Sequence, residues 1–246
     1  MRAEGRALPL QISIQFFSMG AMEMSGPFWP LQIQHLLGPE DVGYTSLLST
    51  LVYAGPMLAA MVMTPVWGRL GDRTGHKAMI IRALLALALC QGLAAVIVDP
   101  WWLVGLRVVQ GALAGFLAAA QAYALAFCDG CRRGHTLARL QSATAVGSLM
   151  GPVAGGWLMD VSGFALLCYG ATVVCLVCVA GSLLLPADTT RRAREKPIAP
   201  MPLPKGWLVS MLLVIVLIQA AKTIPQPFYA LYVADILQAP NWLIGA

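Results

Sequence analysis

Three ionisable side chains lie deep inside long apolar stretches of the sequence, namely Glu23, Arg107 and Lys222. A charge surrounded by hydrocarbon is costly and is therefore a candidate for a proton or substrate pathway. Because a buried carboxylate near a cation is a natural proton carrier, we expect Glu23 to exchange a proton for substrate, with Arg107 or Lys222 as counter-charge. The alternatives are a static ion pair that only locks helices together and, for Arg107, a side chain that snorkels to the membrane surface.

A second group of residues lies in the segment GRLGDRTGHK, which runs from Gly68 to Lys77. Gly68 and Gly75 allow a tight turn with close approach of the backbone. Asp72, Arg73 and Lys77 are able to form an ionic latch across that turn. A generic basic loop is the alternative interpretation.

A third group is the glycine-rich run GSLMGPVAGG, in which Gly147, Gly151 and Gly155 recur every four residues, with Gly156 adjoining. Glycines at this spacing make a flat helix face that a second helix can approach closely. Pro152 removes a backbone hydrogen bond, so we expect it to bend the helix.

Aromatic and amide side chains inside the apolar stretches are candidates to line an amphiphilic pocket: Trp29, Gln32, Gln91, Gln121, Tyr123 and Tyr229. For Trp29, an anchor at the membrane interface is an equal alternative. Pro27 and Pro30 follow Glu23, as Pro225 and Pro227 follow Lys222. We expect these prolines to break their helices where a cavity or a movement tolerates it.

The sequence gives little support for metal, cofactor or enzyme chemistry. The six cysteines lie in apolar stretches or at a helix end, which favours packing over a disulfide framework. Cys128 and Cys131 with His135 offer three metal ligands at most, so a plain helix terminus is favoured there. With no Walker-type loop present, we expect neither a cofactor nor enzymatic activity.

The elements that must position these residues are membrane-spanning helices. The chain of 246 residues is 59% hydrophobic and only 11% charged, against roughly 25% charged residues in soluble domains. A helix needs about 20 mostly apolar residues to cross a bilayer. Seven stretches meet this length, and the first is too long and too interrupted for a cleavable signal peptide. They lie near 10–36, 44–67, 78–98, 101–127, 138–159, 163–185 and 207–234.

The net charge of +5 is distributed by side of the membrane. Nearly all lysines and arginines fall before the first stretch or in alternate connections, whereas the opposite connections carry only acidic residues. This distribution argues against nucleic acid as a partner and, by the positive-inside rule, predicts a cytoplasmic N-terminus in an inner (plasma) membrane.

The chain divides into three parts and contains an internal repeat. Residues 1–185 are expected to form a six-helix bundle, 186–206 a Pro-rich basic cytoplasmic linker, and 207–246 the start of a second bundle. PFWPLQIQHLL from Pro27 matches PFYALYVADIL from Pro227 at an offset of 200 residues. Parallel repeats of six spans are a known way of building a transporter.

Together these motifs resemble the major facilitator superfamily. The Gly68–Lys77 segment is similar to its loop signature, Arg107, Gln110 and Gly111 to its span-four Arg-x-x-Gln-Gly pattern, and GPVAGG to its signature of proton-coupled exporters. The resemblance implies an all-α polytopic bundle truncated from twelve spans to about seven. It also implies that Asp72 latches against a late helix of the second half, which leaves only local partners such as Arg132 or Arg133 here.

The function implied is secondary active transport by alternating access, with proton-coupled, multidrug-type efflux of small amphiphilic molecules favoured. The alternatives are proton-coupled uptake, or export of a metabolite, sugar or siderophore, and, in a different class, a truncated non-transporting membrane protein. The expected partners are the lipid bilayer, a small-molecule substrate and protons. A missing C-terminal half or a second copy would complete the transporter.

Overall fold

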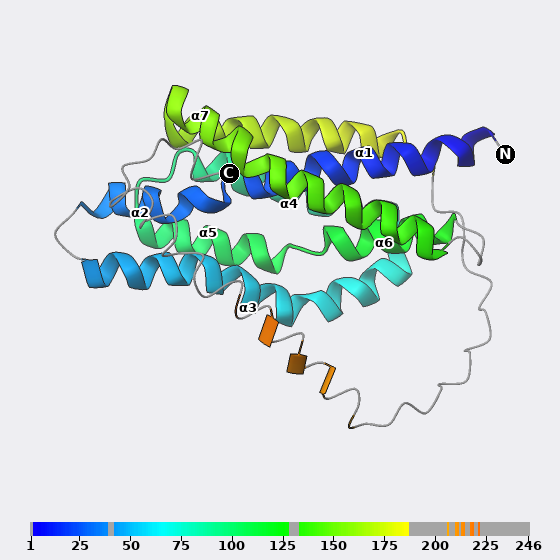
Figure 1. Cartoon of the computed structure of the whole chain (residues 1–246), viewed down its shortest axis with the longest axis horizontal. Coiled ribbons are helices and arrows are strands. Elements are labelled where there is room, and N and C mark those ends of the chain that lie inside the picture. The colour runs from blue at the N-terminus through cyan, green and yellow to red at the C-terminus, as the bar shows by residue number, and fades with distance from the viewer. Residues whose placement is uncertain are drawn as a thin grey trace.

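The structure is a computed structural model that describes residues 2–38, 42–127 and 133–186, with side chains from Ala7 onward except that of Val42. It also describes the isolated residues Gly206, Ser210, Met211, Leu213, Val214, Leu217, Ile218 and Ala221. The three described ranges are helical, and the helices lie lengthwise side by side (Figure 1). The predicted all-α bundle is therefore confirmed. Its elements are α1 (Arg2–Met24), η1 (Gly26–Phe28), α2 (Trp29–Leu37), α3 (Val42–Thr74), α4 (His76–Ala94), α5 (Pro100–Ala112), α6 (Phe116–Ala126) and α7 (Arg133–Leu183).

Four helical stretches of the described chain are long and apolar enough to cross a membrane. They are Gly43–Thr74, His76–Ala94, Pro100–Ala126 and Arg133–Leu183. The last has 51 residues, enough for the two spans predicted at 138–159 and 163–185. These two halves of α7 meet at Gly163, whose φ of 76° and ψ of −178° turn the chain out of helical geometry.

Two of the predicted spans are interrupted. The first divides into α1, η1 and α2 around Gly26, where Pro27 and Pro30 each lack the amide hydrogen that a continuing helix needs. The fourth divides into α5 and α6 at Gly115, which adopts a positive φ of 122°. Asp99 starts α5 by accepting a hydrogen bond from the Trp101 amide at 2.8 Å.

The segment from Gly68 to Lys77 is not the loop that the sequence predicted. α3 continues through Gly68 to Thr74, and α4 begins at His76, so Gly75 alone separates the two helices. Gly75 has φ 94°, and its amide donates to the Gly71 carbonyl at 2.9 Å. The expectation of a turn at Gly68 was wrong because α3 simply runs through it, and the turn requires only one residue with positive φ.

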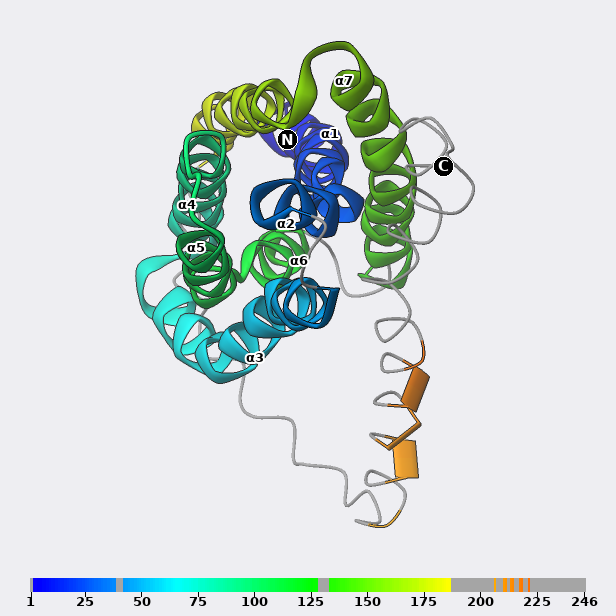
Figure 2. The same ribbon diagram turned by 90° about the vertical axis from the view of Figure 1, so that its left-hand side faces the viewer.

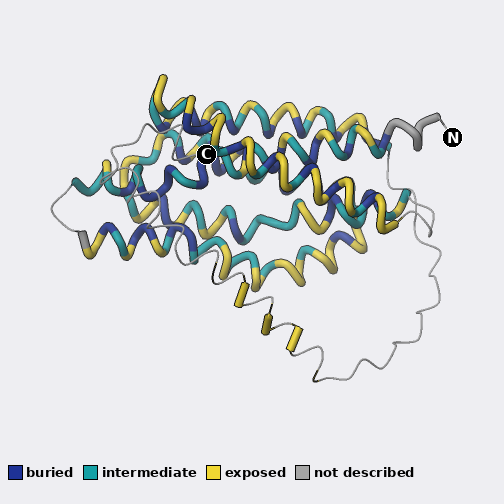
Figure 3. Tube along the Cα trace, in the orientation of Figure 1, coloured by how far each residue is buried: buried dark blue, intermediate teal, exposed yellow. Residues whose placement is uncertain are grey.

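Viewed along the bundle, α1 lies between the two halves of α7, and α3 lies on the opposite side of the bundle (Figure 2). Exposed residues lie mainly on the outward faces of α3 and α7, while α1 is buried along much of its length (Figure 3). The outward faces carry large apolar side chains such as Met61 at 77% exposure and Leu149 at 64%. Contiguous exposed apolar surface of this kind fits contact with lipid.

Several predicted features lie outside the described residues. These are Lys222 and Tyr229, the Cys128–Cys131 pair, Arg132, nearly all of the 186–206 linker, and the matching segment of the repeat that begins at Pro227.

Candidate functional site

The break in the first span forms the centre of the candidate site. η1 starts directly after Ser25, which is fully buried and whose hydroxyl accepts a hydrogen bond from Gln91 Nε2 at 2.9 Å. The Tyr53 hydroxyl donates to the freed Gly26 carbonyl at 2.5 Å. Side chains from α3 and α4 thus satisfy backbone and polar groups that an unbroken α1 would have paired internally.

Glu23 lies in the last turn of α1, immediately before this break, and is half-buried. Its carboxylate adjoins Gly26, where an added Cβ would lie 3.4 Å from Glu23 Oε2. The Arg107 guanidinium interacts electrostatically with Glu23 and with Tyr53. Among the described residues, however, no ion pair joins Glu23 to Arg107, so the proposed Glu23–Arg107 lock is not formed in this conformation.

Arg107 enters the site from α5 and makes two contacts. Its Nη1 donates to Gln110 Oε1 at 2.7 Å, and its guanidinium carbon lies 4.6 Å from the centre of the Trp29 ring. Such stacking is a favourable cation–π arrangement. Arg107 is half-buried, and its Nε has no hydrogen-bond partner in the described part of the chain.

Trp29 is 1% exposed and belongs to the core of the bundle. Its ring meets Phe164 edge-on, with 5.2 Å between centroids, and its Nε1 has no acceptor among the described residues. An anchor at the membrane interface is therefore not what Trp29 does in this structure, because its ring is enclosed on all sides.

The other predicted pocket residues divide by burial. Gln91 is fully buried, and Tyr123 is 1% exposed and donates to the Pro186 carbonyl at 2.9 Å. Gln32 on α2 and Gln121 on α6 are half-buried. The structure thus brings Glu23, Trp29 and Gln91 together around one break but does not place Tyr123 there.

The glycines of the fifth span pack against α1, as the spacing predicted. A Cβ built on Gly147, Gly151 or Gly155 would overlap the carbonyl oxygens of Phe16, Gly20 and Met24 respectively. Gly156 is buried, and α7 continues through Pro152 as helix. Gly111 of the Arg107 motif makes a similar close approach to the backbone of Pro56.

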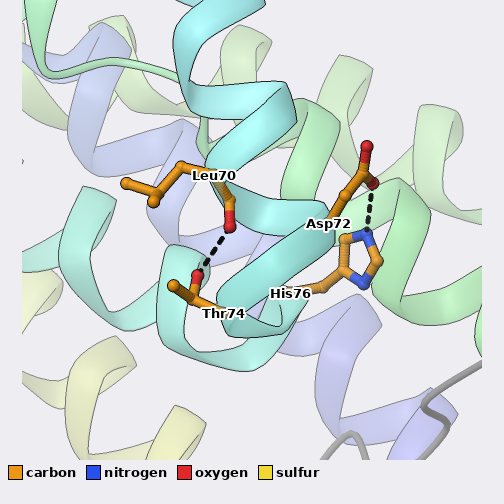
Figure 4. Close-up of polar contacts among 4 residues, drawn as sticks. All are labelled: Leu70, Asp72, Thr74 and His76. Atoms are coloured by element: carbon orange, nitrogen blue, oxygen red, sulfur yellow. Dashed lines mark hydrogen bonds and ion pairs between the residues drawn. The ribbon is translucent and has the colours of Figure 1, made fainter.

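A polar cluster stands at the predicted cytoplasmic end of the bundle. Asp72 Oδ1 lies 3.9 Å from His76 Nε2, and Thr74 Oγ1 donates to the Leu70 carbonyl at 2.9 Å (Figure 4). Among the described residues, the local partner of Asp72 is therefore His76, one turn along, and not Arg133, while Arg132 lies outside the described residues. Arg73 is exposed.

Lys77 from the same segment contacts the end of the sixth span. Its Nζ donates to the carbonyls of Leu183 and Leu185 at 2.9 and 2.5 Å. Unpaired carbonyls at a helix C-terminus favour such a cation. The expected role of Lys77 in the latch with Asp72 is replaced here by capping of α7.

Sequence reasoning missed the residues that hold the break in the fourth span. Trp67 Nε1 donates to the Ala112 carbonyl at 2.6 Å, and Arg82 Nη2 donates to the Ala114 carbonyl at 3.1 Å. The Arg82 guanidinium also lies 3.6 Å above the Trp67 ring. Arg82 lies inside α4, and its guanidinium satisfies a backbone carbonyl at the break between α5 and α6. The closely spaced Gly111 and Gly115 were the available signal for this break.

Comparisons with known proteins agree on one family. The family model described as Major Facilitator Superfamily matches residues 12–244. The staphyloferrin B transporter of Staphylococcus aureus is 36% identical over 183 residues, which cover 74% of this chain and 43% of that protein. The multi-drug resistance efflux pump PmrA homolog of Lactococcus lactis is 30% identical over 239 residues, 93% of this chain and 58% of that one.

A further relative and a solved structure extend the comparison. The multidrug resistance protein MdtG of Dickeya zeae is 30% identical over 227 residues, covering 90% of this chain and 55% of that protein. The crystal structure of the nucleoside transporter NupG superposes with a TM-score of 0.63 at 15% identity, over 96% of this chain and 62% of NupG. That likeness concerns the fold alone, and the chain spans about half the length of the curated relatives that it matches.

Proposed function

Because the chain belongs to the major facilitator superfamily, we propose that its protein is a secondary transporter that exports small amphiphilic molecules in exchange for protons. Named multidrug pumps among the relatives support the export of such molecules. Residues 1–185 would supply one six-helix bundle, 186–206 a cytoplasmic linker and 207–246 the start of a second bundle. The substrate would bind between the two bundles.

One observation carries the proton-coupled mechanism. Among the described residues, Glu23 sits beside a helix break without an ion-pair partner, and Arg107 Nε and Trp29 Nε1 are buried donors without a hydrogen-bond acceptor. The pairing of Glu23 with Arg107 would depend on the proton, because a charged Glu23 would attract Arg107 and a protonated Glu23 would release it. Substrate binding and proton release would then compete for the same group.

The test is transport in proteoliposomes that hold the full-length protein and an imposed pH gradient. We expect Glu23→Gln to lower proton-driven export of a fluorescent cationic dye at least tenfold, while substrate exchange without net proton movement continues. Glu23→Asp keeps the carboxylate and should retain most of the driven transport. Undiminished driven export by Glu23→Gln would refute the role of Glu23 as proton carrier.

A siderophore is the second candidate substrate, favoured by the relative at 36% identity. A carboxylate siderophore would bring acceptors to the unpaired donors of Arg107 and Trp29. Competition between such a siderophore and the dye, in the same vesicles, separates the two substrates. The sign of the pH gradient that drives accumulation separates export from uptake.

The orientation is also part of the proposal, with the N-terminus and Gly75 on the cytoplasmic side. Basic residues on that side of the predicted spans support it. An impermeant thiol reagent should label a cysteine introduced at Arg73 only after the membrane is opened, and one introduced at Asp99 in intact cells.

A further inference from the structure

α1 carries a buried polar face inside the bundle. Gln11, Gln15 and Ser18 are 0%, 0% and 1% exposed, and Ser25 is 0% exposed. The spacing of four and three residues places Gln11, Gln15 and Ser18 on one side of α1, and Ser25 follows directly after the helix ends at Met24. Gln11 lies about 21 Å from Ser25 along the axis, at a rise of 1.5 Å per residue.

Protein groups satisfy only part of this face. Gln15 Nε2 donates to Thr144 Oγ1 at 2.9 Å, and Ser18 Oγ donates to the Gln15 carbonyl at 3.1 Å. Four buried amide atoms of the glutamines on this face and of Gln91 on α4 have no hydrogen-bond partner in the described chain. They are Gln11 Nε2, Gln11 Oε1, Gln15 Oε1 and Gln91 Oε1.

The described residues that pack around Gln11 are apolar. Leu10 and Ile14, on either side of it, pack into an apolar cluster with Ile80 and Leu84 of α4 and Ala120 of α6. Buried side-chain amides nearly always bond to protein or to ordered water. A water held by a donor and an acceptor of Gln11 and an acceptor of Gln15 has the two to four partners it needs.

We propose that α1 holds bound water within the bundle, at Gln11 and Gln15 and again at Gln91. Together with Ser18 and Ser25 these waters form a hydrated path that ends beside Glu23. Its role rests on the proposed function: the path carries protons between Glu23 and the cytoplasmic end of α1. The hydration itself does not depend on that role and is tested first.

Cys178 is a built-in reporter for water at this place. Its thiol is 4% exposed, and its Sγ lies 3.9 Å from the Ile14 carbonyl oxygen, on the helical turn that joins Gln11 to Gln15. Short X-ray pulses convert bound water to hydroxyl radicals that oxidise adjacent thiols. We therefore expect oxidation of Cys178 in the full-length protein in nanodiscs, at a rate well above that of Cys168, which is 0% exposed.

Removing the polar atoms should remove the water. In Gln11→Leu/Gln15→Leu we expect oxidation of Cys178 to fall at least fivefold, whereas Gln141→Leu, the same change at an exposed position of α7, should leave it unchanged. Cys178 oxidation no faster than that of Cys168 in the unaltered protein would overturn the proposal, whether or not the double variant folds. Equal labelling in the double variant and the Gln141→Leu control would overturn it as well.

The role in proton movement has its own test. Gln11→Leu should slow proton-driven export about tenfold and leave substrate exchange unchanged, with Gln141→Leu affecting neither. If Glu23→Gln leaves driven export intact, the proposed function fails, while the labelling result still decides hydration. If Cys178 is labelled but Gln11→Leu transports normally, the path is hydrated and its proton-carrying role is refuted.

Discussion

The guanidinium carbon of Arg107 lies 4.6 Å from the centre of the Trp29 ring, so the buried cation of the fourth span rests on the first residue of α2. The second half of the first span, α2, is thereby connected to α5 through an aromatic face. This contact also explains how an arginine is held within an apolar bundle, because the ring attracts its charge while Gln110 accepts one hydrogen bond.

Replacing Trp29 should weaken its contact with Arg107 more when no aromatic ring remains than when a smaller ring is kept. We expect Trp29→Leu to lower the free energy of unfolding by about 2–4 kcal/mol, as for loss of a buried aromatic, and to reduce transport. Trp29→Phe keeps an aromatic face and should lose less than half as much. Thermal melting in detergent measures both, and equal losses would show that the cation–π contact contributes nothing.

The close approach of α7 to α1 should make Gly151 intolerant of any side chain. In Gly151→Ala the added Cβ would overlap the Gly20 carbonyl oxygen, so we expect a loss of about 1–3 kcal/mol from overpacking. Gly105→Ala is the matched control, since a Cβ there meets nothing within 4 Å. It should gain about 0.5–1 kcal/mol from the better helix propensity of alanine. The two melting temperatures should therefore move in opposite directions.

Lys77 should stabilise the C-terminal end of α7 rather than an ionic contact with Asp72. Lys77→Met removes the donor to Leu183 and Leu185 and should cost about 1 kcal/mol. Arg73→Met, a change at an exposed cation of the same segment, should cost less than a third of that. Hydrogen exchange of the amides near Leu183 provides a local readout, and equal protection in both variants would contradict the capping role.

Trp67 should matter through its indole N–H more than through its ring. Trp67→Phe keeps an aromatic surface under Arg82 but removes the hydrogen bond to the Ala112 carbonyl, at a cost of about 1 kcal/mol. Trp157→Phe, at 63% exposure, is the control and should be nearly neutral. A neutral Trp67→Phe would indicate that the break between α5 and α6 needs no cap from α3.

Five of the seven predicted spans and the glycine contacts were predictable from the sequence because both depend on local properties. Apolar stretches of the required length identified the helices of these five spans, and Gly147, Gly151 and Gly155 met α1 as their spacing indicated. The break at Pro27 and Pro30 was equally local, since a proline cannot continue the helical hydrogen bonds.

The tertiary partners of polar groups were not predictable in the same way. Arg82 reads as one more basic residue near a connection, and only the fold shows that it reaches the Ala114 carbonyl 32 positions along the chain. Tyr53 and Ser25 carry no charge and match no motif, yet both hold the break beside Glu23. The sequence shows that these polar groups are costly to bury, but it does not show which atom of the fold forms the hydrogen bond that offsets the cost.

Gly75 has one further consequence for the bundle. As the single residue between α3 and α4, it sets with its two dihedral angles the rotational phase of all nineteen residues of α4. Successive residues of a helix are rotated by about 100° about its axis. Inserting one residue before His76 would therefore rotate the Arg82 side chain away from Trp67. The backbone conformation of Gly75 therefore determines which face of α4 is turned toward α3 and the break between α5 and α6.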